Sequence, residues 1–157
     1  PIPGVEMNDL DQPILTPKDE LDQFTFNSSV ELSKRNNSSP ENNSKKLTEL
    51  TDQIGGLDLL VLSSGMGDLN EDLNFEIENN TNLLNVNAFT EIVDWTFNYF
   101  QKQGKGHLVA ISSIAGIRGS RIAPAYNASK AYQINYLEGL RQKVTKTKKP
   151  IYGKSIV

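Results

Sequence analysis

The sequence predicts an α/β fold, part of a doubly wound parallel sheet in three α/β/α layers, and two kinds of segment indicate it. Two short apolar runs, residues 57–62 and 108–111, are bounded by glycines or serines and have the composition of strands covered on both faces. Longer segments with apolar residues at helical spacing, 82–102 and 126–145, lie beside them in the chain. Strands that alternate with such helices favour parallel pairing.

The first 44 residues are a poorly assigned lead-in. They are rich in proline, acidic residues and asparagine, and a weak alternation of apolar residues predicts only a possible strand at 24–32. Apolar residues at helical spacing then predict a helix over 45–54 that ends at a glycine pair. Residues 45–157 are expected to form the central and catalytic part of the domain.

Helix and strand alternate in the second half of the chain. Thr81 is expected to cap the long helix, and the acidic, asparagine-rich stretch 68–80 before it is interpreted as a connection. The strand at 108–113 leads into the helix over 126–145, and residues 151–157 begin another strand.

Composition excludes several classes of function. The chain has 157 residues, a formal net charge of −3, 37% hydrophobic residues, no cysteine and a single histidine, which suits one small soluble domain. Mild acidity gives no reason to expect nucleic acid as a partner, and His107 alone makes a metal site unexpected. Because no apolar run is long enough to span a membrane and the first residues lack a signal-peptide pattern, a cytoplasmic location is expected.

Tyr126 and Lys130 are the first candidate catalytic residues. In a helix, residues four apart share a face one turn from each other. A positive charge beside a phenol favours the phenolate and lowers the tyrosine pKa, which would make Tyr126 usable as an acid or base near neutral pH. Such a pair also occurs by chance in many amphipathic helices, so the neighbouring residues must indicate whether it is catalytic.

Two motifs around this pair resemble the catalytic segment of the short-chain dehydrogenase/reductase family. They are Ser112-Ser113-Ile114-Ala115-Gly116 and Tyr126-Asn127-Ala128-Ser129-Lys130-Ala131. In the family, a serine precedes the tyrosine of a YxxxK motif by 13 residues, a spacing that selects Ser113. Adjacent strand residues point to opposite faces, so Ser112 is expected to pack or hydrogen-bond elsewhere.

The resemblance extends to two earlier positions. Asn87 resembles an asparagine that the family places inside the preceding helix, where it distorts the turn and holds a water leading to the lysine; the alternative is that Asn85 or Asn87 merely faces solvent. Asp58-Leu59-Leu60-Val61 is followed by Leu62-Ser63-Ser64-Gly65 where the family has Asn-Asn-Ala-Gly. Only the glycine is retained, so cofactor contact by Ser63, Ser64 and Gly65 competes with a purely structural tight turn.

The resemblance implies a Rossmann-like oxidoreductase that uses NAD or NADP to interconvert a carbonyl and an alcohol, its substrate being a small molecule. Ser113 would hydrogen-bond the carbonyl oxygen and Tyr126 would deliver the proton. Lys130 would lower the tyrosine pKa and grip the nicotinamide ribose, and Asn87 would help feed protons. The alternative is a non-catalytic nucleotide-binding or dimerisation scaffold of the same fold.

The resemblance covers about residues 45–157. The glycine-rich turn that opens a Rossmann-type cofactor domain has no match, and the chain stops before the family's substrate-covering loop, so a fragment or missing segments are expected. Two apolar stripes on the helix over 126–145 and a spare aromatic pair on the preceding helix suggest a second covering surface. In the family these helices commonly form a dimer contact, so a homo-oligomer through 82–102 and 126–145 is expected.

Overall fold

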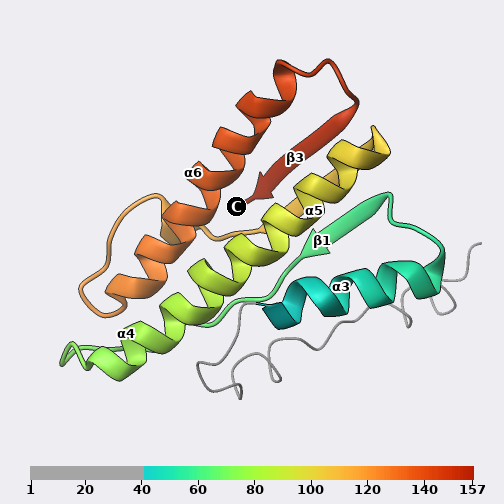
Figure 1. Ribbon diagram of the computed structural model, residues 1–157. Coiled ribbons are helices and arrows are strands. Elements are labelled where there is room, and N and C mark those ends of the chain that lie inside the picture. The colour runs from blue at the N-terminus through green and yellow to red at the C-terminus, as the bar shows by residue number, and fades with distance from the viewer. Residues whose placement is uncertain (1–40) are drawn as a thin grey trace, which may run out of the picture.

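The computed structural model describes residues 41–157, which form helices packed against a short sheet (Figure 1). The possible strand at 24–32 and the rest of the lead-in up to residue 40 lie outside the described residues. The sheet contains β1 (Leu59–Leu62), β2 (Gly106–Ile111) and β3 (Ile151–Ile156), in that spatial order. Both pairings are parallel, which confirms the predicted class of sheet.

The register brings the carboxyl ends of the strands to one edge. Leu62 pairs with Ala110, and Ala110 pairs with Ser155. The turn after β1 and the serines after β2 therefore leave the sheet at the same edge, where ligands bind in open α/β sheets.

Three long helices accompany the strands: α3 (Glu41–Ile54), α5 (Phe89–Gln103) and α6 (Pro124–Thr145). Gly104 ends α5 in the left-handed conformation, with φ of 89°, and its N–H bonds to the Phe100 carbonyl. The core joins the inner faces of α5 and α6 to one face of the sheet; it includes Phe89, Val93, Phe100, Leu108, Ala110, Leu137 and Ile151. Among the described residues, no helix combines the length and apolarity that a membrane crossing needs.

Helical structure begins at Phe75, before the start of the helix that the sequence predicts over 82–102. Residues 68–80 do not form a simple connection, because they contain the start of α4 (Phe75–Asn82), which is capped by the Asn74 side chain through the Glu76 N–H. Thr81 is therefore not the cap but a buried residue inside the helix. Helix α4 has no buried apolar stripe, and its first residue, Phe75, is 79% exposed. Apolar periodicity in the sequence therefore does not indicate this helix.

A π-helical turn, η1 (Leu83–Ala88), joins α4 to α5. Such turns are rare and occur often at functional sites. The segment 83–88 contacts α6, the helix that carries Tyr126.

Both apolar stripes of α6 find partners within the chain. Leu137 and Val144 are buried in the core below the helix. Tyr132 and Tyr136 pack edge-on against Phe89 of α5, with ring centroids 6.4 and 6.3 Å away. The second stripe therefore does not by itself require another subunit.

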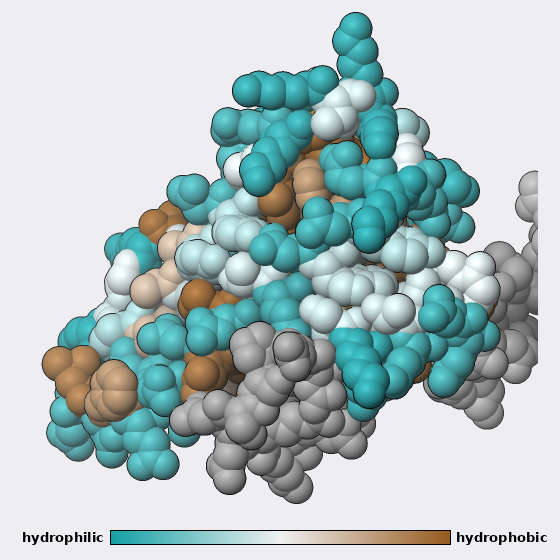
Figure 2. Space-filling model, in the orientation of Figure 1, coloured by the Kyte–Doolittle hydropathy of each residue, from teal (hydrophilic) through white to brown (hydrophobic). Residues whose placement is uncertain are grey.

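The opposite face of the sheet is open among the described residues. Side chains that alternate with the core positions, Leu59, Val61, Ile111 and Ile156, are 38–54% exposed. In contrast, the face that carries the helices is mainly hydrophilic, and apolar surface gathers at its α4 end (Figure 2). The described part of the molecule thus has one helix-covered face and one bare apolar face.

Candidate active site

The two serines after β2 have different partners. Ser112 Oγ donates to the Lys130 carbonyl at 3.1 Å, which confirms that Ser112 hydrogen-bonds elsewhere. Ser113 is half-buried, and its Oγ accepts the Ala115 N–H at 3.1 Å as the cap of a short 3₁₀ turn, Ile114–Gly116. Gly116 lies so close to α6 that a Cβ there would be 2.8 Å from the Lys130 carbonyl carbon. The segment that carries Ser113 is therefore held against the turn of α6 that carries Lys130.

The start of α6 presents the tyrosine and the lysine together. Pro124 begins the helix, where its missing N–H costs nothing. Tyr126 is half-buried, Lys130 is only 4% exposed, and Lys130 Nζ lies 5.7 Å from the centroid of the Tyr126 ring. Burial lowers the pKa of the Lys130 ammonium. The ammonium therefore lies over the Tyr126 ring and largely out of water.

Gln133 completes the surroundings of the lysine, and sequence reasoning missed it. Lys130 Nζ donates to Gln133 Oε1 at 3.2 Å, and Gln133 Nε2 donates to the Asn85 carbonyl at 2.9 Å. A buried helical glutamine looks like an ordinary surface residue in a sequence. The available signal is its position four residues before Leu137, on the buried face of α6.

The structure corrects the position expected for Asn87. Asn85 is fully buried in the π-helical turn, and its amide bonds to both backbone groups of Met66 and to Ser129 Oγ. Asn87 is exposed, because residues two apart in a helix lie on nearly opposite sides. The amide that the structure brings to the lysine is therefore that of Asn85, one of the two residues that the sequence allowed to face solvent.

The turn after β1 lies directly on these residues. A Cβ on Gly65 would be 2.9 Å from Lys130 Nζ and 3.4 Å from Asn85 Oδ1, and a Cβ on Gly67 would overlap the Tyr126 ring. Ser63 is exposed and Ser64 half-buried. The turn therefore approaches the tyrosine and lysine through its backbone, and a side chain at position 67 would collide with the Tyr126 ring.

Glu78 anchors the first turn of α6, and no local pattern in the sequence identifies it. Its Oε2 accepts the Ala125 N–H at 2.8 Å, and its Oε1 accepts the Asn70 amide at 2.6 Å. Asn70 N–H in turn bonds to the Ile122 carbonyl at 2.7 Å. An acidic side chain at a helix N-terminus satisfies a free N–H and complements the helix dipole. The residue before Tyr126 is thus fixed from α4.

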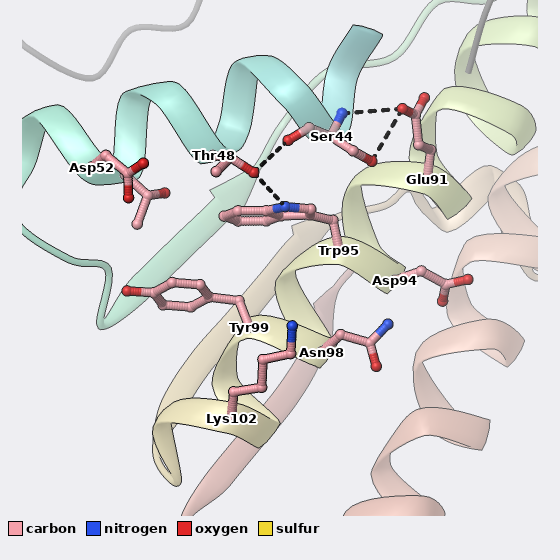
Figure 3. Close-up of a pocket in the computed structure, with 10 residues that line it drawn as sticks. Ser44, Thr48, Asp52, Glu91, Asp94, Trp95, Asn98, Tyr99 and Lys102 are labelled. Atoms are coloured by element: carbon pink, nitrogen blue, oxygen red, sulfur yellow. Dashed lines mark hydrogen bonds between the residues drawn. The ribbon is translucent and has the colours of Figure 1, made fainter. Parts of the chain in front are cut away.

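A separate groove of about 510 Å³ lies between α3 and α5 (Figure 3). Trp95 and Tyr99 stack there, with centroids 5.3 Å apart, and Trp95 Nε1 donates to Thr48 Oγ1 at 3.1 Å. Glu91 accepts the Ser44 N–H at 3.1 Å, which ties the start of α3 to α5. The groove contains none of the expected catalytic residues, and Ser44, Glu91, Thr48 and Trp95 in its lining join the two helices.

Known proteins resemble this chain in sequence and in fold. A profile of the short chain dehydrogenase family matches residues 11–153, which begins well before the part that the motifs indicate. An uncharacterized oxidoreductase of Myxococcus xanthus is 31% identical over 99 residues, which are 62% of this chain and 39% of that protein. The chain therefore spans well under half the length of this relative.

Solved structures show the fold. The structure of NAD⁺-bound xylitol dehydrogenase matches with a TM-score of 0.68 and 20% identity over 74% of this chain and 45% of that chain. The structure of ElxO with NADP bound matches with a TM-score of 0.65 and 21% identity over 74% and 48%. These likenesses support the three-layer Rossmann-like α/β/α fold, of which the described residues supply one helical layer and part of the sheet. With the profile covering most of the sequence, the chain belongs to the short chain dehydrogenase family.

Proposed function

We propose that the whole protein is an NAD- or NADP-dependent oxidoreductase that interconverts a carbonyl and an alcohol, with Tyr126 as general acid and base. The observation that carries the proposal is the buried ammonium of Lys130 beside the Tyr126 ring. Burying a cation costs free energy, which its hydrogen bond and ring contact offset only in part, and such costly groups gather at functional sites; here the cation lies beside a phenol whose ionised form it would stabilise.

Ser113, Lys130 and Asn85 have roles beside Tyr126 in this reaction. In the reducing direction, Ser113 donates a hydrogen bond to the substrate oxygen and Tyr126 delivers a proton to it. Lys130 favours the phenolate that remains. Asn85, rather than Asn87, takes the part of the helix asparagine, because its amide fixes the turn that lies on the tyrosine and lysine.

The residues around this turn fit a nicotinamide cofactor. The bare backbone at Gly65 gives a ligand close approach, and the Lys130 ammonium and the Tyr126 hydroxyl can hydrogen-bond its ribose. Ser63 and Ser64 border the same turn. When bound, the nicotinamide supplies or accepts the hydride, while this chain supplies position and polarity.

Replacing the tyrosine tests the proposal. Tyr126→Phe removes the acid but keeps the ring against Gly67, so turnover of a panel of ketones and aldehydes should fall by about 100-fold to 10,000-fold, with NADH and NADPH affinity nearly unchanged. Tyr152→Phe is the matched control, because Tyr152 is exposed on β3 and stacks on His107. Retained turnover in Tyr126→Phe would overturn the assignment.

A non-catalytic nucleotide-binding scaffold is the second candidate function. The departure of Leu62-Ser63-Ser64-Gly65 from the family's Asn-Asn-Ala-Gly favours it. Titration of NADH and NADPH against the whole protein separates the two functions, since binding without hydride transfer to any carbonyl compound supports the scaffold.

A homo-oligomer through α5 and α6 is also proposed. The stripes of α6 are already packed within the chain, so the support comes from the groove beside α5, where Trp95 and Tyr99 stack and are only partly buried. Sedimentation of the whole protein and of a Trp95→Ala variant tests whether this groove joins two copies.

A further inference from the structure

Gln133 is a buried polar residue, in contact with Lys130, to which the proposed reaction gives no role. Its side chain is 1% exposed, although glutamine is mostly a surface residue. Both ends of the carboxamide are used: Nε2 bonds to the Asn85 carbonyl at 2.9 Å, and Oε1 accepts from Lys130 Nζ at 3.2 Å. One neutral side chain therefore connects the π-helical turn to the lysine of the candidate site.

The Asn85 carbonyl is a fixed point for this link. It lies in η1, and the Asn85 side chain is itself held by Met66 and Ser129. A glutamine anchored to such a point presents its oxygen to the ammonium in one position. A side chain that could rotate freely would fix neither group.

Gln133 also provides a hydrogen-bond acceptor for the Lys130 ammonium. Within the part of the chain that the structure describes, no carboxylate forms an ion pair with Lys130. The groups that face it are Tyr126 on α6, the titratable one, with Asn85 from η1 and Gly65 from the turn after β1, both neutral. An ammonium has three donors, so one bond to Gln133 leaves two for Tyr126 and a ligand.

We propose that Gln133 is a positioning residue, which fixes the Lys130 ammonium beside Tyr126 by tying it to the Asn85 carbonyl. The effect of Gln133 on catalysis rests on the proposed function above. The hydrogen bonds from Gln133 to Lys130 and Asn85 do not depend on it. A neutral carboxamide does not take up or release protons at ordinary pH, so Gln133 holds the ammonium without serving as a proton carrier.

The link is tested without activity by titrating Lys130 in the whole protein. Lysine labelled with ¹³C at Cε gives the pKa by NMR, with the signal assigned by its loss in Lys130→Met. Gln133→Met removes the acceptor and should lower the Lys130 pKa further; Gln133→Glu places a carboxylate there and should raise it. The control Gln142→Met lies on an exposed part of α6 and should change nothing. An unchanged pKa in both Gln133 variants would overturn the proposal.

The catalytic part is tested by turnover. Small displacements of a catalytic group can cost up to ~100-fold in rate, so Gln133→Met should lose about 10- to 100-fold in kcat with substrate KM little changed. Gln133→Glu keeps the acceptor for Lys130 but, as a carboxylate, cannot donate to the Asn85 carbonyl, so it should also lose activity, though less than Gln133→Met. If Gln133→Met fails to fold, the Gln133→Glu pKa decides. A wild-type protein without turnover would refute the proposed reaction, whereas wild-type kcat in a folded Gln133→Met would refute the positioning role.

Discussion

Asn85 holds Met66 by both polar groups of its backbone. Its Oδ1 accepts the Met66 N–H at 2.9 Å, and its Nδ2 donates to the Met66 carbonyl at 2.6 Å. The same Nδ2 donates to Ser129 Oγ at 2.9 Å. One buried amide thus connects the turn after β1, the π-helical turn and α6, the three segments that surround Lys130.

Truncating this amide should lower the stability of the fold. Asn85→Ala leaves the Met66 backbone and Ser129 without their partner, so the free energy of unfolding should fall by about 1–3 kcal/mol in urea titrations. Asn87→Ala, two residues along on the exposed side, should stay within about 0.5 kcal/mol of the wild type. Equal effects of the two changes would contradict the assignment of Asn85.

The buried lysine should leave a signature in the pH dependence of stability. Burial lowers the Lys130 pKa below 10.5, so between the lowered value and 10.5 the unfolded chain binds more protons than the folded one. Stability contributed by this group therefore rises with pH across that window. Urea titrations at increasing pH should show a smaller rise for Lys130→Met, whereas Lys154→Met, at an exposed position, should retain the wild-type slope.

Adding one methyl group to the turn should displace the tyrosine. In Gly67→Ala the new Cβ would overlap the Tyr126 ring, so kcat should fall by about 100-fold while the fold survives. Gly119→Ala places its Cβ in open space and should keep full activity. Turnover is measured with the substrate that the wild type accepts, and far-ultraviolet circular dichroism checks folding. Full activity of Gly67→Ala would mean that the turn can move aside.

Glu78, which lies on α4, should stabilise the first turn of α6. Glu78→Ala removes the acceptor of the Ala125 N–H, a loss comparable to that of an N-cap, so the free energy of unfolding should fall by about 0.5–2 kcal/mol. Glu76→Ala, an exposed change on the same helix, is the control. Differential scanning calorimetry compares the two, and a larger loss in Glu76→Ala would show that the Ala125 contact contributes little.

The sequence predicts what depends on local spacing. Tyr126 and Lys130 meet because they are four residues apart in a helix, and Ser112 and Ser113 separate because they are adjacent. Asn85 could not be chosen over Asn87 in the same way, since both suit a helix and only the π-helical turn decides which one is buried. Gln133 and Glu78 act through partners 48 and 47 residues away in the chain, and no local pattern records such pairs.

The exposed apolar side of the sheet should affect the solubility of residues 41–157. A row of exposed branched aliphatic side chains on neighbouring strands is the kind of surface that binds other apolar surfaces, detergents and fluorescent dyes. Residues 41–157 produced alone should therefore aggregate or bind such dyes, because no described residue covers this side of the sheet.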